Sequence, residues 1–116
     1  MNPKISVITV CLNSEKTIQR SIQSVLSQKY KEVEYIVIDG GSDDRTNKIL
    51  ESFEENIDIL VSEKDKGLYD ALNKGINLSN GEIIGILHSD DVFEHDTVLS
   101  NIANIMANND VDMCFS

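Results

Sequence analysis

The sequence has few basic residues and no long apolar run. Of its 116 residues, 10 are Lys or Arg and 20 are Asp or Glu, giving a formal net charge of −10. Binding to nucleic acid or to an anionic membrane patch needs clustered Lys and Arg, so this balance argues against both. No apolar stretch approaches the ~18 residues of a transmembrane segment, and no secretory signal opens the chain. We therefore expect a cytoplasmic protein.

Cysteine is also scarce. Cys11 and Cys114 lie near opposite ends of the chain inside apolar segments, which is typical of two buried thiols rather than of a disulfide framework. With 41% hydrophobic residues, a chain of this length buries roughly 60% or more of its unfolded surface. It therefore needs neither disulfides nor a metal in order to fold, and we expect one domain over residues 1–116.

The glycine-rich motifs that bind phosphate are missing. No G-x-G-x-x-G follows the first apolar segment and no G-x-x-x-x-G-K-[ST] occurs, which disfavours dinucleotide-binding dehydrogenases and P-loop enzymes. The two histidines, His88 and His95, have no convincing nucleophile beside them, so a Ser-His-Asp or Cys-His set is not indicated. Any handling of phosphate is therefore expected to depend on a metal ion.

What the sequence does contain is a regular alternation of short apolar strands and amphipathic helices. Strands are expected at residues 4–10, 35–38, 57–61, 82–87 and 111–115. Helices are expected at 14–28, around 49–53, from 68 to the Asn80-Gly81 pair, and from 98 onward. This alternation predicts an α/β fold that is doubly wound, with a mostly parallel sheet and helices on both faces.

The same patterns predict helix ends and buried faces. Asn13 or Ser14 is the candidate N-cap of the first helix, and residues 42–44 are expected to cap and begin the second. The residues expected to form the apolar faces of the third and fourth helices are Leu68, Leu72 and Ile76, and Val98, Ile102 and Ile105.

Polar residues follow each expected strand, at the sheet edge where parallel sheets bind ligands. Asp39 ends the second strand, where its carboxylate is placed to accept a hydrogen bond from a ligand N–H. An Asp-Gly pair alone is more often a turn former, so that reading stays open.

Asp90 and Asp91 end the fourth strand. Adjacent carboxylates repel each other unless a cation or a donor compensates, and carboxylate oxygens suit Mg²⁺ or Mn²⁺. A solvated acidic turn before a helix is the alternative, but the position after a central strand favours the metal. His88 is either a further ligand or a neutral, hydrogen-bonded histidine.

Four segments together resemble the N-terminal half of a family 2 glycosyltransferase with the GT-A fold. Residues 5–15 resemble the family's opening strand and its N-x-E turn, and residues 37–46 resemble its D-[DG]-G-S-x-D-x-T segment. Residues 63–75 resemble the E-x-D-x-G-x-Y-D-A-x-N-K-G variant common in bacterial surface-polysaccharide enzymes, and residues 88–91 resemble the DxD-type metal motif.

The resemblance implies an inverting, metal-dependent enzyme that transfers sugar from a nucleotide-diphosphate donor, most often a uridine one. The acceptor would be a glycan or lipid-linked molecule in surface polysaccharide synthesis. Asp39 would accept a hydrogen bond from the base, and Asp91 would hold Mn²⁺ or Mg²⁺ on the diphosphate. Asp90 would help to bind the ribose or the metal. The other substrate-binding residues it implies are Thr9, Asn13, Glu15, Lys66, Gly67, Asp70 and Asn73. For Asp70 and Asn73, a role in capping or bracing the third helix is equally expected.

Two departures from the family pattern qualify these expectations. His88 stands where many relatives carry Asp or Asn, which would alter metal affinity or the groups around the ligands. The acceptor half of the family, with its general base, normally follows this half, so we expect the base beyond Ser116 and a chain that is truncated. An edge strand exposed at 111–115 would favour a homodimer, and a location at the inner face of the membrane is compatible with the full-length protein.

Two alternatives stay open at this point. One is a receiver-like Mg²⁺-binding signalling domain, which has a similar length and an acidic pocket but would be expected to place its acidic pair after the first strand. The other is a catalytically silent nucleotide-binding module of the same fold.

Overall fold

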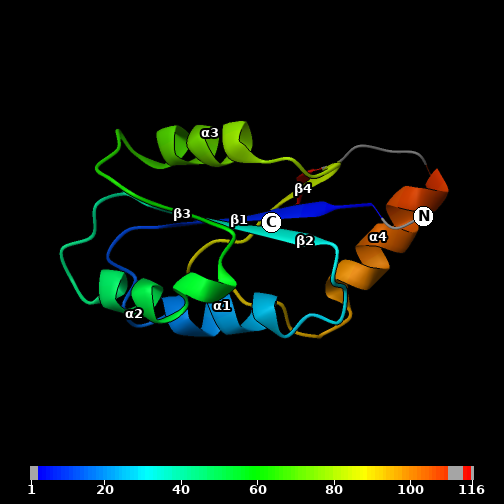
Figure 1. Cartoon of the computed structure of the whole chain (residues 1–116), viewed down its shortest axis with the longest axis horizontal. Coiled ribbons are helices and arrows are strands. Elements are labelled where there is room, and N and C mark those ends of the chain that lie inside the picture. Colours follow the sequence, from blue (N-terminus) through cyan, green and yellow to red (C-terminus); the bar gives the residue numbers. More distant parts are fainter. Residues whose placement is uncertain (1–2, 110–113, 116) are drawn as a thin grey trace.

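The computed structural model describes residues 3–109 and 114–115 and shows one sheet covered by helices (Figure 1). The strands are β1 (Ile5–Cys11), β2 (Val33–Asp39), β3 (Ile59–Ser62), β4 (Ile83–Ile86) and β5 (Cys114–Phe115). The helices are α1 (Ile18–Leu26), α2 (Thr46–Ser52), the 3₁₀ turn η1 (Glu54–Asn56), α3 (Leu68–Leu78) and α4 (Val98–Asn109). The predicted fold class is confirmed.

The sheet has the strand order β3-β2-β1-β4-β5, and each neighbouring pair is parallel. β1 is paired on both sides: Ile8 is in register with Ile36 of β2 and with Ile86 of β4. At the end of β1, Cys11 is in register with Asp39. Because parallel strands run in one direction, the segments that leave β1, β2 and β4 begin at the same edge of the sheet.

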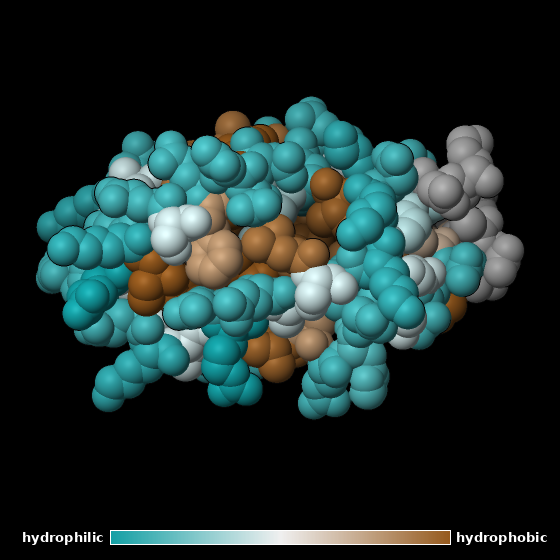
Figure 2. Space-filling model, turned by 60° about the horizontal axis from the view of Figure 1, so that its bottom comes forward, coloured by the Kyte–Doolittle hydropathy of each residue, from teal (hydrophilic) through white to brown (hydrophobic). Residues whose placement is uncertain are grey.

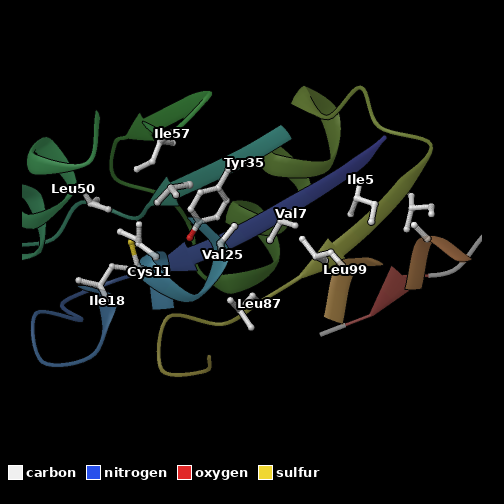
Figure 3. Close-up of a cluster of buried hydrophobic side chains, with 14 of the residues drawn as sticks. Ile5, Val7, Cys11, Ile18, Val25, Tyr35, Leu50, Ile57, Leu87 and Leu99 are labelled. Carbon is white, nitrogen blue, oxygen red and sulfur yellow. The ribbon is translucent and has the colours of Figure 1, made fainter. Parts of the chain in front are cut away.

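Helices cover both faces, with α1, α2 and α4 on one side and α3 on the other (Figure 1). Alternate residues of the central strands supply each core: Val7, Tyr35 and Val37 pack on the α1 side, and Ile8 and Ile36 on the α3 side. Figure 3 shows Tyr35 within the larger cluster, close to Val7 and Val25. Burial on both faces explains why the strands read as almost continuous apolar runs.

The α1 side is closed by half-buried hydrophobic residues such as Leu26, Tyr30 and Phe53. Figure 2, which brings this side forward, shows apolar surface in the middle of the face with hydrophilic residues around it. A small hollow of about 130 Å³, lined in part by Leu26, Tyr30 and Val33, opens there. It is smaller than the roughly 300 Å³ at which small-molecule pockets begin.

The apolar face predicted for α3 is correct at one of its three residues, because Leu72 packs against the core between α3 and the sheet. It is wrong at the other two. Leu68 and Ile76 are 50% and 40% exposed, while Ala71 and Gly75 are buried against the sheet. A Cβ on Gly75 would lie 2.6 Å from Cγ2 of Ile8, so any side chain at this position would force Ile8 or the helix to shift. The close approach of helix and sheet selects small residues, which a search for large apolar residues passes over.

The face predicted for α4 is displaced by one position. Leu99, Ala103 and Met106 are buried, whereas Ile105 is 58% exposed. The last strand was expected at 111–115. Of these residues, 111–113 lie outside the described part of the chain, as does the side chain of Cys114, and β5 is described at Cys114–Phe115. Within the described residues, no helix combines the length and hydropathy needed to cross a membrane.

The predicted helix caps also differ from those observed. α1 has Thr17 at its N-cap and α2 has Arg45, and neither makes a side-chain capping bond. Instead, the carbonyl of Ser14 accepts from the amides of Thr17 and Ile18, and Oδ1 of Asp44 accepts from the amide of Thr46 at 2.9 Å. Asp44 thus bonds the start of α2 as expected, whereas the side chains of Asn13 and Ser42 are used in contacts between loops.

A buried carboxylate, Glu34, organises the amino-terminal edge of the sheet. Its side chain accepts from Ser6 Oγ at 2.8 Å, from the Asn80 amide at 2.8 Å and from Asn80 Nδ2 at 3.3 Å. Burial acts to raise the pKa of Glu34, but these hydrogen bonds outweigh it and hold the pKa below its ordinary value. The charged carboxylate thus stabilises the connection from α3 to β4.

We expect Glu34→Gln to lower the free energy of unfolding by about 1–3 kcal/mol at neutral pH, because the amide cannot accept from Asn80 Nδ2. Since the pKa of Glu34 is lower in the folded state, its stabilising effect is complete above the ordinary value of 4.5 and is lost as pH falls through the folded value. Urea unfolding over a pH series should show the difference from wild type shrinking in acid. A constant difference would contradict the proposed role, and Glu51→Gln, exposed on α2, is the control.

Candidate functional site

A cleft of about 1000 Å³ lies at the carboxyl ends of β1 and β4. Its walls are residues 10–17, which leave β1, residues 88–91, which follow β4, the start of α3 and Asp44. At this point the strand order reverses, since the chain leaves β1 toward β2 on one side and leaves β4 toward β5 on the other. Such a switch point is where open α/β sheets bind ligands. The volume is also in the range of small-molecule sites.

The charges that line the cleft are mostly negative. Five lining residues are carboxylates and one is a lysine: Glu15, Asp44, Asp65, Asp90, Asp91 and Lys16. Negative charges that line a concave surface add to one negative electrostatic potential, which attracts cations. An anionic ligand would therefore enter this cleft together with a cation.

Asp90 and Asp91 lie on a tight turn directly after β4. The amide of Asp91 donates to the carbonyl of His88 at 2.9 Å, and both aspartates are exposed and line the cleft. The hydroxyls of Ser89 and Ser14 are 2.9 Å apart and join this turn to the segment after β1. The two carboxylates thus lie in the cleft, and their binding of a metal or ligand stays a prediction.

The described residues contain no group of three or more His, Cys, Asp or Glu side chains arranged around a single point. Mg²⁺ and Mn²⁺ commonly take only one or two carboxylates from the protein and complete their shells with phosphate oxygens and water. The exposed pair at Asp90 and Asp91 fits a metal of that kind and does not fit a closed structural site.

Asp39 differs from its prediction as a ligand acceptor. It is 0% exposed and does not line the cleft. Its Oδ1 accepts from Cys11 Sγ at 3.6 Å and from Ser42 Oγ, and its Oδ2 accepts from the Ser42 amide at 3.1 Å and Ser62 Oγ at 2.8 Å. A carboxylate has about four acceptor positions, so this one is saturated by the protein. Asp39 therefore ties the loop after β2 to the ends of β1 and β3.

Cys11 takes part in the same cluster. Burial, followed by the negative charge of Asp39 and its hydrogen bond, raises the pKa of the Cys11 thiol well above its ordinary value. The thiol stays protonated and donates to Asp39. It is the buried thiol that the sequence predicted at this position.

The loop after β2 in turn shapes the cleft wall formed by residues 13–15. Ser42 Oγ accepts from the Asn13 amide, and Asn13 Oδ1 accepts from the Asp43 amide, both at 2.8 Å. Asn13 has a φ of +50°, a conformation that Asn adopts more readily than most residues. The Asn13 side chain thus holds two loops together, and it also lines the cleft, where contact with substrate stays a prediction.

Asp44 was expected only to begin a helix, but it also lines the cleft. Partial burial acts to raise its pKa, while hydrogen bonds from Thr46 and from the amide of Glu15 lower it, and the net pKa is below the ordinary value. Asp44 therefore stays charged and fixes the backbone of Glu15 beside the cleft.

The segment between β3 and α3 supplies the opposite wall. Gly67, with a φ of +121°, lines the cleft, and its amide donates to Asp65 Oδ1 at 3.0 Å. Lys66 does not line the cleft, and its amide donates to Asp70 Oδ2 at 3.0 Å. Asp70 braces the start of α3, which is the structural alternative considered for it. Asn73 is exposed on α3 and is not part of the lining.

Thr9 is a further predicted site residue that does not line the cleft. It is 0% exposed, and its Oγ1 lies 3.0 Å from the hydroxyl of Tyr35 inside the core. A hydroxyl buried in the core needs a hydrogen-bond partner. Thr9 therefore serves as the partner of the Tyr35 hydroxyl and does not line the cleft.

The sequence interpretation missed several residues that line the cleft. Ser14, Lys16, Asp65 and Ser89 belong to it. Each lies within a few residues of the end of a strand, and a full reading of every post-strand segment would have included them.

Comparison with known proteins relates the chain to glycosyltransferases. A family model described as "Glycosyl transferase family 2" matches residues 6–116. The Escherichia coli enzyme UDP-Glc:alpha-D-GlcNAc-diphosphoundecaprenol beta-1,3-glucosyltransferase WfgD is 36% identical over 106 residues, which cover 90% of this chain and 42% of that protein.

Two solved structures share the fold. Staphylococcus aureus TarS 1-349 in complex with UDP-GlcNAc aligns with a TM-score of 0.84 and 28% identity, over 92% of this chain and 32% of that one. The mannosyltransferase PcManGT from Pyrobaculum calidifontis, in complex with GDP-Man and Mn²⁺, aligns with a TM-score of 0.86 and 25% identity, over 96% and 34%. The chain spans less than half the length of the relatives it matches.

The role of the Asp39 carboxylate in holding the loops together can be tested with Asp39→Asn. The amide group can accept at its oxygen only, so at least one donor of the cluster is left unpaired, and we expect a loss of about 1–3 kcal/mol in the free energy of unfolding. Asp43→Asn, exposed in the same loop, is the matched control and should change little. If Asp39→Asn unfolds at the same urea concentration as wild type, the carboxylate is not holding the loops.

Proposed function

The chain belongs to glycosyl transferase family 2, and from that premise we propose that its cleft binds the nucleotide-diphosphate sugar whose sugar is transferred. The family and the GT-A fold expected from the four motif segments are thereby confirmed. The 116 residues are proposed to act as the donor-binding domain. The receiver-like alternative gains no support, because Leu12, Asn13 and Ser14 follow β1 where an acidic pair would be expected.

One observation carries the proposal: the acidic cleft lies at the carboxyl ends of β1 and β4 and contains the exposed pair Asp90 and Asp91. A nucleotide diphosphate is itself an anion, so it would be repelled by this lining unless a divalent cation accompanied it. We propose Asp91, supported by Asp90, as the residues that hold Mn²⁺ or Mg²⁺. The bound ion would neutralise negative charge on the departing diphosphate. The solved structure of PcManGT, a protein of similar fold, is a complex with GDP-Man and Mn²⁺.

The nucleoside is proposed to lie on the other side of the cleft. Leu12 and Leu68 line it and are 56% and 50% exposed, so they offer apolar surface on which a flat base can pack. Through the loop contacts described above, Asp39 and Asn13 would keep this wall in place without contacting the base. We propose uridine as the nucleoside, in keeping with the UDP-GlcNAc complex of TarS.

For the acceptor we propose a glycan or lipid-linked molecule of surface polysaccharide synthesis. The name of the E. coli relative includes a diphosphoundecaprenol acceptor, which supports a lipid-linked glycan. We propose transfer with inversion, and we assign the general base to none of the residues that line the cleft.

The test is calorimetric titration of UDP with and without Mn²⁺. We expect Mn²⁺ to raise the UDP affinity of the wild type, and Asp91→Asn to remove about tenfold to a hundredfold of that affinity, since a charge-assisted contact contributes roughly 1.5–3 kcal/mol. Asp96→Asn, an exposed carboxylate outside the cleft lining that pairs with Lys29, is the control and should behave as wild type. GDP titrated in parallel tests the choice of base.

Equal UDP affinity in wild type and Asp91→Asn in the presence of Mn²⁺ would refute the role of Asp91. UDP affinity that Mn²⁺ does not change in the wild type would refute the metal requirement itself. Tighter binding of GDP than of UDP would replace uridine by guanosine and leave the rest of the proposal intact.

A further inference from the structure

Three polar side chains lie in a row along α1 and the turn that follows it. They are Ser21, Ser24 and Gln28, and we call them the α1 polar row. Their spacing of three and four residues places them on one side of the helix. Ser21 is 0% exposed, Gln28 is 2% exposed and Ser24 is half-buried. Buried polar groups at helix positions are costly unless they are hydrogen-bonded, so their partners indicate what they do.

All three side chains bond to the backbone of the segment 88–99. Ser21 Oγ donates to the carbonyl of His88 at 3.3 Å, and Ser24 Oγ accepts from the amide of Phe93 at 3.0 Å. Gln28 makes two such contacts: Nε2 donates to the carbonyl of His95 at 2.7 Å, and Oε1 accepts from the amide of Leu99 at 3.1 Å. Figure 1 shows this segment passing beside α1 on its way from β4 to α4.

The segment needs such partners because residues 87–97 form neither helix nor strand. Backbone groups that are buried without regular structure must be satisfied by side chains or water. Gln28 also satisfies an amide in the first turn of α4, where the helix itself provides no acceptor. The α1 polar row therefore fixes the path of the whole connection from β4 to α4.

The turn that carries Asp90 and Asp91 is the first part of this connection. The α1 polar row holds it from one side through His88, and Ser14 holds it through Ser89. Ser14, in the turn that leads into α1, belongs to the same structural unit. The position of the two carboxylates thus depends on α1, although no residue of the α1 polar row lines the cleft.

We propose that the α1 polar row, with Gln28 as its main member, is a positioning device for the carboxylate turn at Asp90 and Asp91. The inference rests on the proposed function, because it assigns the device to the metal-dependent part of donor binding. Removing Gln28 would let the connection after Phe93 relax and would misplace Asp91, while the rest of the cleft would keep its shape.

The test compares Gln28→Met with Gln23→Met, a matched change at an exposed position of the same helix. In the first measurement, UDP is titrated with and without Mn²⁺. For Gln28→Met we expect metal-free UDP binding within about twofold of wild type and a loss of about tenfold in the gain due to Mn²⁺. Gln23→Met should keep the full gain. Ser24→Ala, a smaller change in the same row, should lose part of the gain in UDP affinity due to Mn²⁺. This variant replaces Gln28→Met in the test if Gln28→Met does not fold.

In the second measurement, amide hydrogen exchange is followed without any ligand. We expect the amides of Asp91, Phe93 and Leu99 to exchange at least about tenfold faster in Gln28→Met than in wild type, with no change in the amides of β1 and β2. Since this readout needs neither metal nor nucleotide, it tests the positioning of the turn by itself.

The outcomes separate the inference from the proposed function. A full Mn²⁺ gain in folded Gln28→Met, or a uniform loss of UDP binding with and without Mn²⁺, would overturn the inference alone. Amide hydrogen exchange that becomes faster by the same factor throughout the sheet would also overturn the inference alone, because it would mean that Gln28 only stabilises the fold. A wild type that gains nothing from Mn²⁺ would overturn the proposed metal site and the inference with it.

Discussion

β1 is hydrogen-bonded on both sides, and its parallel pairing with β2 and β4 is the constraint on which the site depends. The pairing brings the segments that leave β1, β2 and β4 to one edge of the sheet, although they are far apart in the sequence. The reversal of strand order at β1 then keeps the connections after β1 and β4 from covering each other. The cleft is what lies between them, and its position follows from the topology before any side chain is considered.

The carboxylates near this edge divide into two groups according to their partners. Asp39 and Asp44 accept hydrogen bonds from the loops around them and hold those loops in place. Asp90 and Asp91 are exposed in the cleft. A carboxylate whose acceptor positions are filled contributes to the shape of a site, whereas one with open positions can bind a ligand. Burial and hydrogen bonding, rather than residue type, thus distinguish the carboxylates that hold the loops from those that we propose to bind the cation.

The sequence was sufficient for the fold class and for the succession of strands and helices along the chain. It also placed Asn13, Glu15, Gly67, Asp90 and Asp91 correctly at the cleft. These features depend on local periodicity and on the rule that ligands bind beyond the ends of parallel strands. Asp39 and Thr9 could not be placed from the sequence, because their roles depend on partners 28 and 26 residues away in the chain. Those partners are set by the register of β1 against β2. Ala71 and Gly75 on the buried face of α3 were missed because the close approach of α3 to β1 requires small residues.

The most direct measurement of the central claim is the paramagnetic effect of Mn²⁺ on the amide spectrum of the chain in the presence of UDP. If the cleft holds the nucleotide diphosphate and its cation, signals from residues 14–16 and 88–91 should broaden first, and those of Glu34, Asn80 and Gly81 at the opposite edge of the sheet should stay sharp. Broadening centred on the opposite edge, or equal broadening throughout the described residues, would contradict the location of the site.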